Sequence, residues 1–398
     1  MKRRSFLYAA ALLAITLTGC SSSDPVNGDV SNTDTDLPST AVNSNVKILL
    51  SSKAESITRA SIESDDQQNF EQKGLHIFCL ATRQMENGLK FPIDWSQRTA
   101  NSYSVWMDNV KANATIKTDG NAKEYTDIEW ADGKIYYYPT GNGHSYSFYG
   151  IYPEADSIKY ESTAVTAKIP VNGYTDVLWG AAENLTDYYA YSAKYFRQHP
   201  ETNGTAQMNF KHAFMRLKFS IKAGKDANGS FVPASKTGIK SLSVANVPRA
   251  VQLRVADATD RSNEGKVVGY IYNNVGVDSV SLRDLQDQIY PGQDAVYPKA
   301  TGEETLLDGA VIVPLPPTGS IYTMNINLEE INPDGTKRVT YHAIRVPIEL
   351  ANGRSFEAGH SYTIHITVYS STKVTLNAKL ARWIEDDSSF KPTTGEAI

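Results

Sequence analysis

The residue with the most clearly defined chemistry lies near the amino end. Cys20 ends the tetrapeptide LTGC, which follows three basic residues at positions 2–4 and an apolar run from Phe6 to Leu17. A basic start, an apolar stretch and small residues before a cleavage point make up a secretory signal. A cysteine at the first mature position adds a thiol that can take diacylglycerol. We therefore predict a signal peptide over residues 1–19, cleavage between Gly19 and Cys20, and lipidation of Cys20.

This apolar run is too short for a membrane anchor, because a spanning helix needs roughly 20 apolar residues. The segment RRSFL at positions 3–7 also resembles a twin-arginine signal, a pattern that any basic start can produce by chance. The sequence therefore favours an outer-membrane lipoprotein that is exposed at the cell surface and carries palmitate among its lipids.

Catalytic patterns are missing from the rest of the chain. It has no HExxH, no CxxC pair and no P-loop, and GHSYS at 143–147 lacks the last glycine of a nucleophile elbow. Carboxylates are plentiful and leave a glycosidase pair open, although a solvated surface charge is the commoner role. Cys79, the one thiol besides Cys20, lies in the apolar run LHIFCL, which favours a buried hydrophobic residue over a nucleophile. We predict no enzyme activity, no metal and no cofactor.

Aromatic residues offer a different chemistry, because sugars stack on exposed aromatic rings. Strand residues of this type are more often core residues or cross-strand partners. The alternative of a glycan-binding platform rests on a set that comprises Trp95, Trp106, Trp130, Trp179, Tyr136, Tyr137, Tyr138, Tyr146, Phe148, Tyr149 and Tyr152.

Net charge excludes one class of partner. The chain carries 39 Lys and Arg against 44 Asp and Glu, a formal charge of −5, and loss of residues 1–19 removes three cations and no acid, which gives −8. A nucleic-acid partner needs a concentrated basic patch, whereas the cations here are scattered singly among acids. We expect no nucleic acid among the partners.

The elements that must position these residues are almost all strands. Residues 20–45 are rich in Ser, Asp, Asn, Thr and Pro and have little to bury, so we expect a flexible lipidated tether. After the tether, apolar residues alternate with polar ones, which indicates sheets with one packed face and one solvated face. A short helix is expected near 280–288. The inward rows are Val46, Ile48 and Leu50; Ala213, Met215, Leu217, Phe219 and Ile221; Tyr362, Ile364, Ile366 and Val368; and Val374, Leu376, Ala378 and Leu380.

A polar break at 199–207 divides the folded part of the chain. We predict an N-terminal β-sandwich domain over 46–204 and a C-terminal β-sandwich domain over 205–398. The tetrapeptide GHSY occurs at 143–146 and again at 359–362, each time ahead of an alternating strand. Turn chemistry alone can repeat so short a motif, so it supports two similar units only weakly.

A strand, a polar loop and a single arginine follow one another where the folded part begins. The strand is 46–51, the loop is 52–58, and Arg59 precedes Ala60. Together with further motifs in order, this element resembles the fimbrillins, subunits of the type V pili of Gram-negative anaerobes. The resemblance spans the chain and rests on LTGC at 17–20, TRA at 58–60, YYYP at 136–139, YSFYGIYP at 146–153, FKHAFMRLKF at 210–219, and GHSYTIHITV at 359–368 leading to Trp383.

This resemblance implies an all-β fold of two transthyretin-like β-sandwich domains in tandem, with few short helices. It also implies that an arginine-specific protease removes the first strand, here by cleavage between Arg59 and Ala60. Loss of an edge strand, with Val46, Ile48 and Leu50, would expose unpaired backbone groups and an apolar groove that a strand of another subunit can fill. The implied function is that of a structural subunit of a cell-surface fimbria, or pilus, which contributes to adhesion as a stalk, tip or anchor component.

The donor strand is harder to assign. The carboxy-terminal segment is expected to donate in stalk subunits of the family, yet the tail after Trp383 contains Pro392 and few large apolar residues. The better candidate is the row Val374, Leu376, Ala378 and Leu380. The expected partners are other fimbrial subunits, the protease, the lipid anchor before processing, and a host or glycan ligand. The alternative function is a surface-anchored glycan-binding lipoprotein that keeps its lipid and its first strand and is not polymerised.

Overall fold

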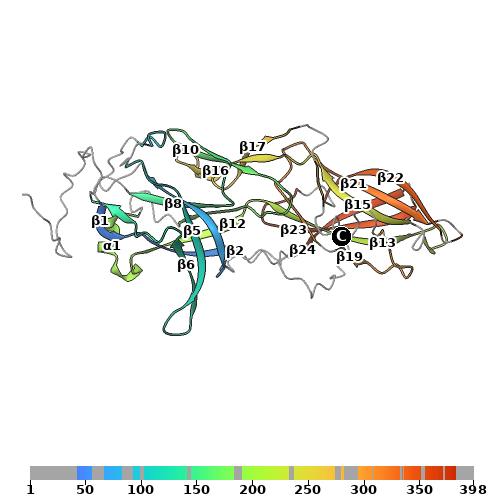
Figure 1. The fold of residues 1–398 in the computed structure, drawn as a ribbon, viewed down its shortest axis with the longest axis horizontal. Coiled ribbons are helices and arrows are strands. Elements are labelled where there is room, and N and C mark those ends of the chain that lie inside the picture. The colour runs from blue at the N-terminus through green and yellow to red at the C-terminus, as the bar shows by residue number, and fades with distance from the viewer. Residues whose placement is uncertain are drawn as a thin grey trace, which may run out of the picture.

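Strands dominate the computed structural model, which confirms the all-β prediction. It describes residues 43–55, 67–82, 93–98, 103–140, 145–182, 191–232, 237–273, 279–281, 295–307, 309–331, 334, 336–350, 355–370 and 373–381. The molecule is elongated, with β1, β2, β6 and β8 toward one end and β13, β15, β21 and β22 toward the other (Figure 1). Among the described residues no helix is long and apolar enough to cross a membrane.

The largest sheet closes on itself. Its order is β12-β11-β8-β4-β5-β6-β2-β3, and β2 also pairs with β12, so seven of its eight strands form a closed barrel. The bounds are β2 Leu49–Glu55, β3 Gln67–Gln68, β4 Gln72–Ala81, β5 Val105–Thr118, β6 Glu124–Trp130, β8 Tyr146–Tyr152, β11 Leu178–Ala182 and β12 Thr205–His212.

Two glycines make room for an aromatic ring inside this barrel. A Cβ on Gly180 would lie 2.6 Å from the Phe210 ring, and a Cβ on Gly150 would lie 2.7 Å from the same ring. Glycine within a strand commonly marks such a close approach. The fully buried Phe210 ring therefore fills space that any other residue at these two positions would occupy.

A second sheet, of order β17-β16-β10-β9, covers the outside of the barrel. Residues 75–81 of β4 and 146–151 of β8 are buried without alternation, because one face lines the barrel and the other lies under this sheet. The indole of Trp179 donates from Nε1 to the Val255 carbonyl of β16 at 2.9 Å. The bounds are β9 Ser157–Tyr160, β10 Ala164–Pro170, β16 Ala250–Asp257 and β17 Val267–Ile271.

Two further sheets form the other end of the molecule. In one, β13 pairs in parallel with β23, β24 lies beyond β23, and β14, β19 and β20 pair with the other edge of β13; the second has the order β18-β15-β21-β22. The bounds are β13 Met215–Lys225, β14 Phe231–Val232, β15 Thr237–Ala245, β18 Ser279–Ser281, β19 Thr305–Leu306, β20 Val311–Val313, β21 Tyr322–Ile331, β22 Lys337–Ile348, β23 Ser361–Ser370 and β24 Lys373–Ala381.

The remaining elements are short. A two-stranded pair joins β1 (Asn43–Lys47) to β7 (Tyr137–Pro139), and the one α-helix among the described residues is α1 (Ala193–Gln198). The 3₁₀ turns are η3 (Pro200–Thr202) and η4 (Arg261–Asn263). Of the helix expected near 280–288, residues 279–281 form β18 instead, and 282–288 lie outside the described residues.

Strand pairing crosses the predicted boundary at residue 204. The polar break around it is the turn formed by η3 and Gly204, and β12 directly after it belongs to the barrel. The hairpin of β16 and β17 also joins the first half of the chain, because β16 pairs with β10. A polar break marks a loop, and loops occur within sheets as well as between domains. The division into two tandem domains stays a proposal.

Candidate functional site: the slot of the first strand

The segment 46–51, expected to be one edge strand, is neither one strand nor an edge. β1 ends at Lys47, β2 begins at Leu49, and the Ile48 N–H between them donates to the Tyr136 carbonyl at 2.8 Å. The chain bends at Ile48, so β1 pairs with β7 whereas β2 enters the barrel. The prediction of an edge strand is wrong because β2 has a neighbour on each side.

Both edges of β2 are held by backbone pairing. It runs parallel to β12, with Leu49 opposite Thr205 and Ala54 opposite Phe210. It runs antiparallel to β6, with Leu50 opposite Ile128. We call this position between β6 and β12 the β2 slot; the strands that form it lie together in Figure 1. Without β2 the barrel would be open along this line.

Side chains of the segment alternate as the sequence predicted. Ile48 and Leu50 are each 1% exposed, and Val46 is partly buried against the core. Lys47 is exposed, and Leu49 is 44% exposed. The two fully buried side chains contribute about 3–6 kcal/mol of hydrophobic free energy.

The inward row continues beyond the residues that sequence analysis selected. Ser52 is 2% exposed and lies between Met208 of β12 and Thr126 of β6. Ala54, partly buried, lies beside Phe210. Buried and exposed side chains keep alternating through these positions. A search for alternating large apolar residues misses them because Ser52 and Ala54 are small.

Few side-chain contacts hold the start of this segment. The Ser44 hydroxyl accepts from the Val46 N–H at 3.1 Å, and Arg197 of α1 donates to the Asn45 side-chain oxygen at 3.3 Å. Most of the attachment is therefore backbone pairing and burial.

The predicted processing residues lie outside the described residues. Gly19 and Cys20 precede residue 43, and Arg59 and Ala60 fall within 56–66, the segment that joins β2 to β3. Glu55 at the end of β2 pairs with Gln67 at the start of β3, so the two ends of this segment lie side by side. A cut at Arg59 would leave β1 and β2 with no covalent link to the rest of the chain.

The candidate donor strand is already paired in this chain. β24 runs antiparallel to β23, with Leu376 opposite Ile366, and no other described strand pairs with it. Val374 and Leu376 are partly buried against the core. The side chains of Ala378 and Leu380 lie outside the described set.

Most residues of the alternative aromatic platform are core residues, as expected for aromatic residues in strands. Trp95, Trp179, Tyr138, Tyr146, Phe148 and Tyr149 are all buried. The half-buried Trp106 uses its indole N–H on the Tyr137 carbonyl at 2.8 Å. Cross-strand packing thus accounts for most of this set. Cys79 is fully buried and burial raises the pKa of its thiol, as a structural role requires.

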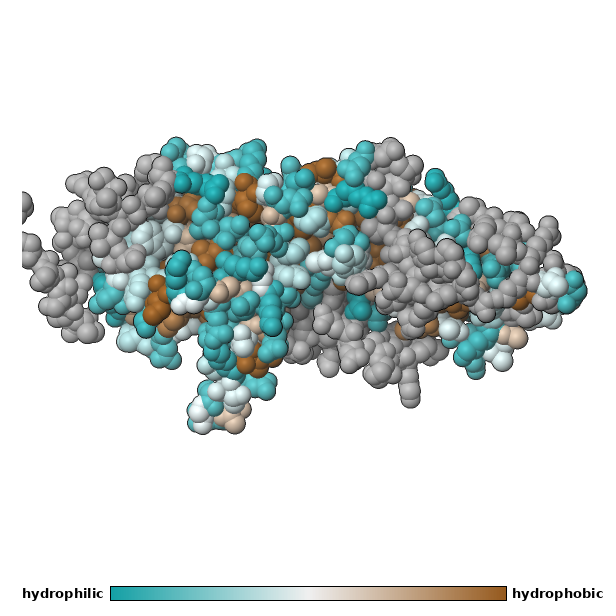
Figure 2. Space-filling model, viewed as in Figure 1, coloured by the Kyte–Doolittle hydropathy of each residue, from teal (hydrophilic) through white to brown (hydrophobic). Residues whose placement is uncertain are grey.

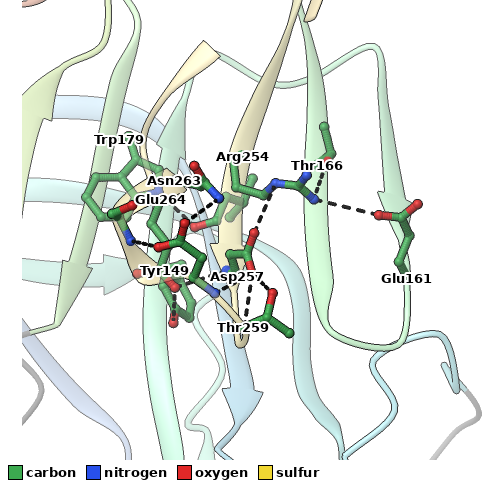
Figure 3. A network of polar contacts seen from close by, with 12 residues as sticks. Tyr149, Glu161, Thr166, Trp179, Arg254, Asp257, Thr259, Asn263 and Glu264 are labelled. Carbon is green, nitrogen blue, oxygen red and sulfur yellow. Dashed lines mark hydrogen bonds and ion pairs between the residues drawn. The ribbon is translucent and has the colours of Figure 1, made fainter. Parts of the chain in front are cut away.

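A buried polar network joins the second sheet to the barrel (Figure 3). Glu264, which follows η4, is 6% exposed and accepts from the Tyr149 hydroxyl at 2.9 Å and from the Asp257 N–H at 3.0 Å. Burial raises the pKa of Glu264, and these hydrogen bonds offset only part of that effect. The Nε atom of Arg254 lies 3.7 Å from Oδ2 of Asp257, and its Nη1 atom lies 3.7 Å from Oε2 of Glu161. The described residues hold no group of three or more His, Cys, Asp or Glu placed to bind a metal.

The fold and the slot define an all-β protein in which β2 is inserted between two other strands and is followed in sequence by Arg59. A model of the fimbrillin-like family matches residues 58–383, and the chain belongs to that family. No curated protein matches the chain.

Several solved structures are similar. A fimbrial protein from Bacteroides vulgatus has 12% identity and a TM-score of 0.48, with 84% of this chain and 99% of that chain covered. The fimbrial anchor protein Mfa2 from Porphyromonas gingivalis has 10% identity and a TM-score of 0.34, with 84% and 99% covered. The tip fimbrial protein Mfa3 from the same organism has 9% identity and a TM-score of 0.35, with 85% and 100% covered. The family assignment rests on the sequence match.

Proposed function

We propose that this chain is a structural subunit of a cell-surface fimbria that polymerises by exchange of its first strand. In this proposal it is exported as a lipoprotein through Cys20 and then cut between Arg59 and Ala60. The observation that supports it most directly is the β2 slot, since the only covalent link from β2 to the rest of the fold passes through residues 56–66. The family match also begins at Thr58, which leaves β1 and β2 outside it.

Loss of β2 would create a groove that binds a strand of another subunit strongly. The facing edges of β6 and β12 would both carry unpaired N–H and C=O groups, and the space left by Ile48 and Leu50 would open the core to water. A strand of another subunit restores both ladders and the buried surface at once. Each ladder hydrogen bond adds a net of about 0.5–1.5 kcal/mol.

Docking of apolar faces is a weaker route to assembly. The face shown in Figure 2 carries apolar residues singly among polar ones. Within the described ranges the large exposed apolar residues are spread over different strands and the connections between them: Leu49, Tyr125, Ile135, Tyr174, Phe231, Val268 and Ile321. Scattered residues of this kind are usual on monomers, whereas an apolar interface needs a contiguous patch.

The amino terminus of the mature protein tests the proposal. Mass spectrometry of surface material should find a chain that starts at Ala60, and electron microscopy should show fibres. Arg59→Ala should abolish both. Arg59→Lys keeps the charge but removes the side chain that an arginine-specific protease requires, so it should behave like Arg59→Ala. Surface chains that start at an acylated Cys20 and form no fibres would contradict the proposal and favour the anchored, unpolymerised glycan binder.

A stalk, a tip or an anchor position is compatible with one acceptor slot. A subunit that only accepts a strand ends the fibre, and one that also donates a strand extends it. The row Val374, Leu376, Ala378 and Leu380 remains our candidate donor, which would have to leave β23 first.

A further inference from the structure

One residue of β2 does not suit the slot that holds it. The hydroxyl of Ser52 is buried and has no hydrogen-bond partner among the residues that the structure describes. Its neighbour on β12 is Met208, whose thioether is a poor acceptor. Its neighbour on β6 is Thr126, whose hydroxyl accepts from the Phe70 N–H at 3.0 Å and faces the Phe70 carbonyl at 3.4 Å.

Ser52 thus differs from the two inward residues before it. Ile48 and Leu50 fill apolar space, whereas the Ser52 hydroxyl loses its hydration and gains no hydrogen bond from the described part of the chain. An unmade hydrogen bond of this kind costs more than a made one contributes. Backbone pairing holds β2 as far as Ala54 and Glu55, so the weak point of the strand is this one side chain in its middle.

We infer that Ser52 is the residue that makes β2 replaceable. A strand that places an aliphatic side chain at the position of Ser52 in the slot would displace β2. This inference rests on the proposed function, because it concerns the strand that cleavage would free. The occupant it selects is a strand of a second copy of this chain or a related subunit with an apolar row that has no hydroxyl at that level. Replacement then has a direction: the outgoing strand carries the buried unpaired hydroxyl and the incoming strand does not.

The candidate donor of this chain meets that requirement. In the sequence its alternating row reads Val, Leu, Ala and Leu at 374, 376, 378 and 380, whereas the inward row of the amino-terminal segment reads Ile, Leu, Ser and Ala at 48, 50, 52 and 54. With Leu376 at the level of Leu50 and the same strand direction, Ala378 comes to the level of Ser52. The hydroxyl is replaced by a hydrogen, Leu376 matches Leu50, Val374 takes the position of Ile48, and the larger Leu380 takes that of Ala54.

The test compares Ser52→Ala with Ser51→Ala in the full-length protein. Ser51 is the adjacent residue of the same type, on the outer face of β2 and only partly buried. Each variant is treated with an arginine-specific protease, and release of the amino-terminal fragment is followed by size-exclusion chromatography and mass spectrometry. The thermal unfolding midpoint of the uncut protein is measured as a second readout.

We expect Ser52→Ala to raise the unfolding midpoint and to slow release of the fragment about 5-fold to 150-fold, the factor for the ~1–3 kcal/mol of an unpaired buried group. Ser51→Ala should match the parent in both readouts. A Ser52→Ala midpoint equal to or below that of the parent overturns the inference, because the hydroxyl then has a partner. Equal release rates for the two variants overturn it as well. A parent that retains its fragment after cleavage refutes the proposed function instead, and the midpoints still decide whether Ser52 is the weak point of the strand.

Discussion

Adjacent leucines in β2 allow a direct test of how the first strand is held. Leu50 is 1% exposed inside the barrel, and Leu49 is 44% exposed on its outer face. Truncation of a fully buried leucine to alanine costs about 2–5 kcal/mol, because apolar contact is lost and a cavity remains. The same change at a half-exposed leucine costs about 0.5 kcal/mol or less. Leu50→Ala should therefore weaken the strand strongly, and Leu49→Ala should leave it nearly unchanged.

Two measurements report on this difference. In urea unfolding of the uncut protein, the free energy of unfolding should fall for Leu50→Ala by the amount given above. After cleavage at Arg59, the same free energy weakens retention of the fragment about 30-fold or more, at a factor of ten for each 1.4 kcal/mol. Leu49→Ala serves as the matched control, with the same atoms removed from the next residue of the strand. Equal effects of the two substitutions, in either assay, would refute the inserted-strand geometry.

Further predictions concern the lipid, the buried carboxylate and the barrel interior. Cys20→Ser should leave the protein unlipidated, and membrane fractionation should find it outside the outer membrane; normal fractionation would contradict a lipoprotein. Because burial raises the pKa of Glu264 above its ordinary value of 4.5, its stabilising contribution is present below that value and is lost as pH rises through the raised pKa. The unfolding midpoint of the parent relative to Glu264→Gln should therefore fall with rising pH above 4.5, and a constant difference would contradict this. Gly180→Ala, whose new methyl would meet Phe210 at 2.6 Å, should cost about 1–3 kcal/mol, whereas Gly120→Ala, with nothing within 4 Å, should be neutral in the same unfolding assay.

Alternation in the sequence predicted well which residues of a strand face the core. Alternation at 361–370 identified the buried row of Tyr362, Ile364, Ile366 and Val368. The row that starts at Ala213 is also buried, but the chain leaves the barrel at 213–214, between β12 and β13. In β12 the buried residues are the even-numbered Ala206, Met208 and Phe210, whereas the row from Ala213 onward is odd-numbered, so the buried parity changes where the chain leaves the barrel. The predicted row began after this change and therefore did not show where the first sheet ends.

Closure of the barrel could not be predicted from the sequence. The pairing of β2 with β12 joins residues about 155 positions apart, and nothing local distinguishes such a strand from an edge strand. Gly150 and Gly180 resemble ordinary strand irregularities until Phe210 is placed against both. The turn at Gly204 has the composition of a domain linker, although strands on both sides of it belong to one sheet.

The pairing of β24 and of the β2 slot also gives a reason why β24 of one molecule would fill the slot of another after β2 has left. β24 is paired on one side only among the described strands, with β23, whereas the β2 slot offers a partner on each side. Once β2 has left, a strand that moves from the edge position into the empty slot exchanges one ladder for two, and the additional ladder adds about 0.5–1.5 kcal/mol for each hydrogen bond. Before cleavage β2 occupies the slot, and its covalent link through residues 56–66 holds it at a high effective concentration that a strand from another molecule cannot match. Cleavage at Arg59 removes that advantage without altering any contact in the slot. The protease would therefore act as the switch, and the slot itself would remain the same before and after assembly.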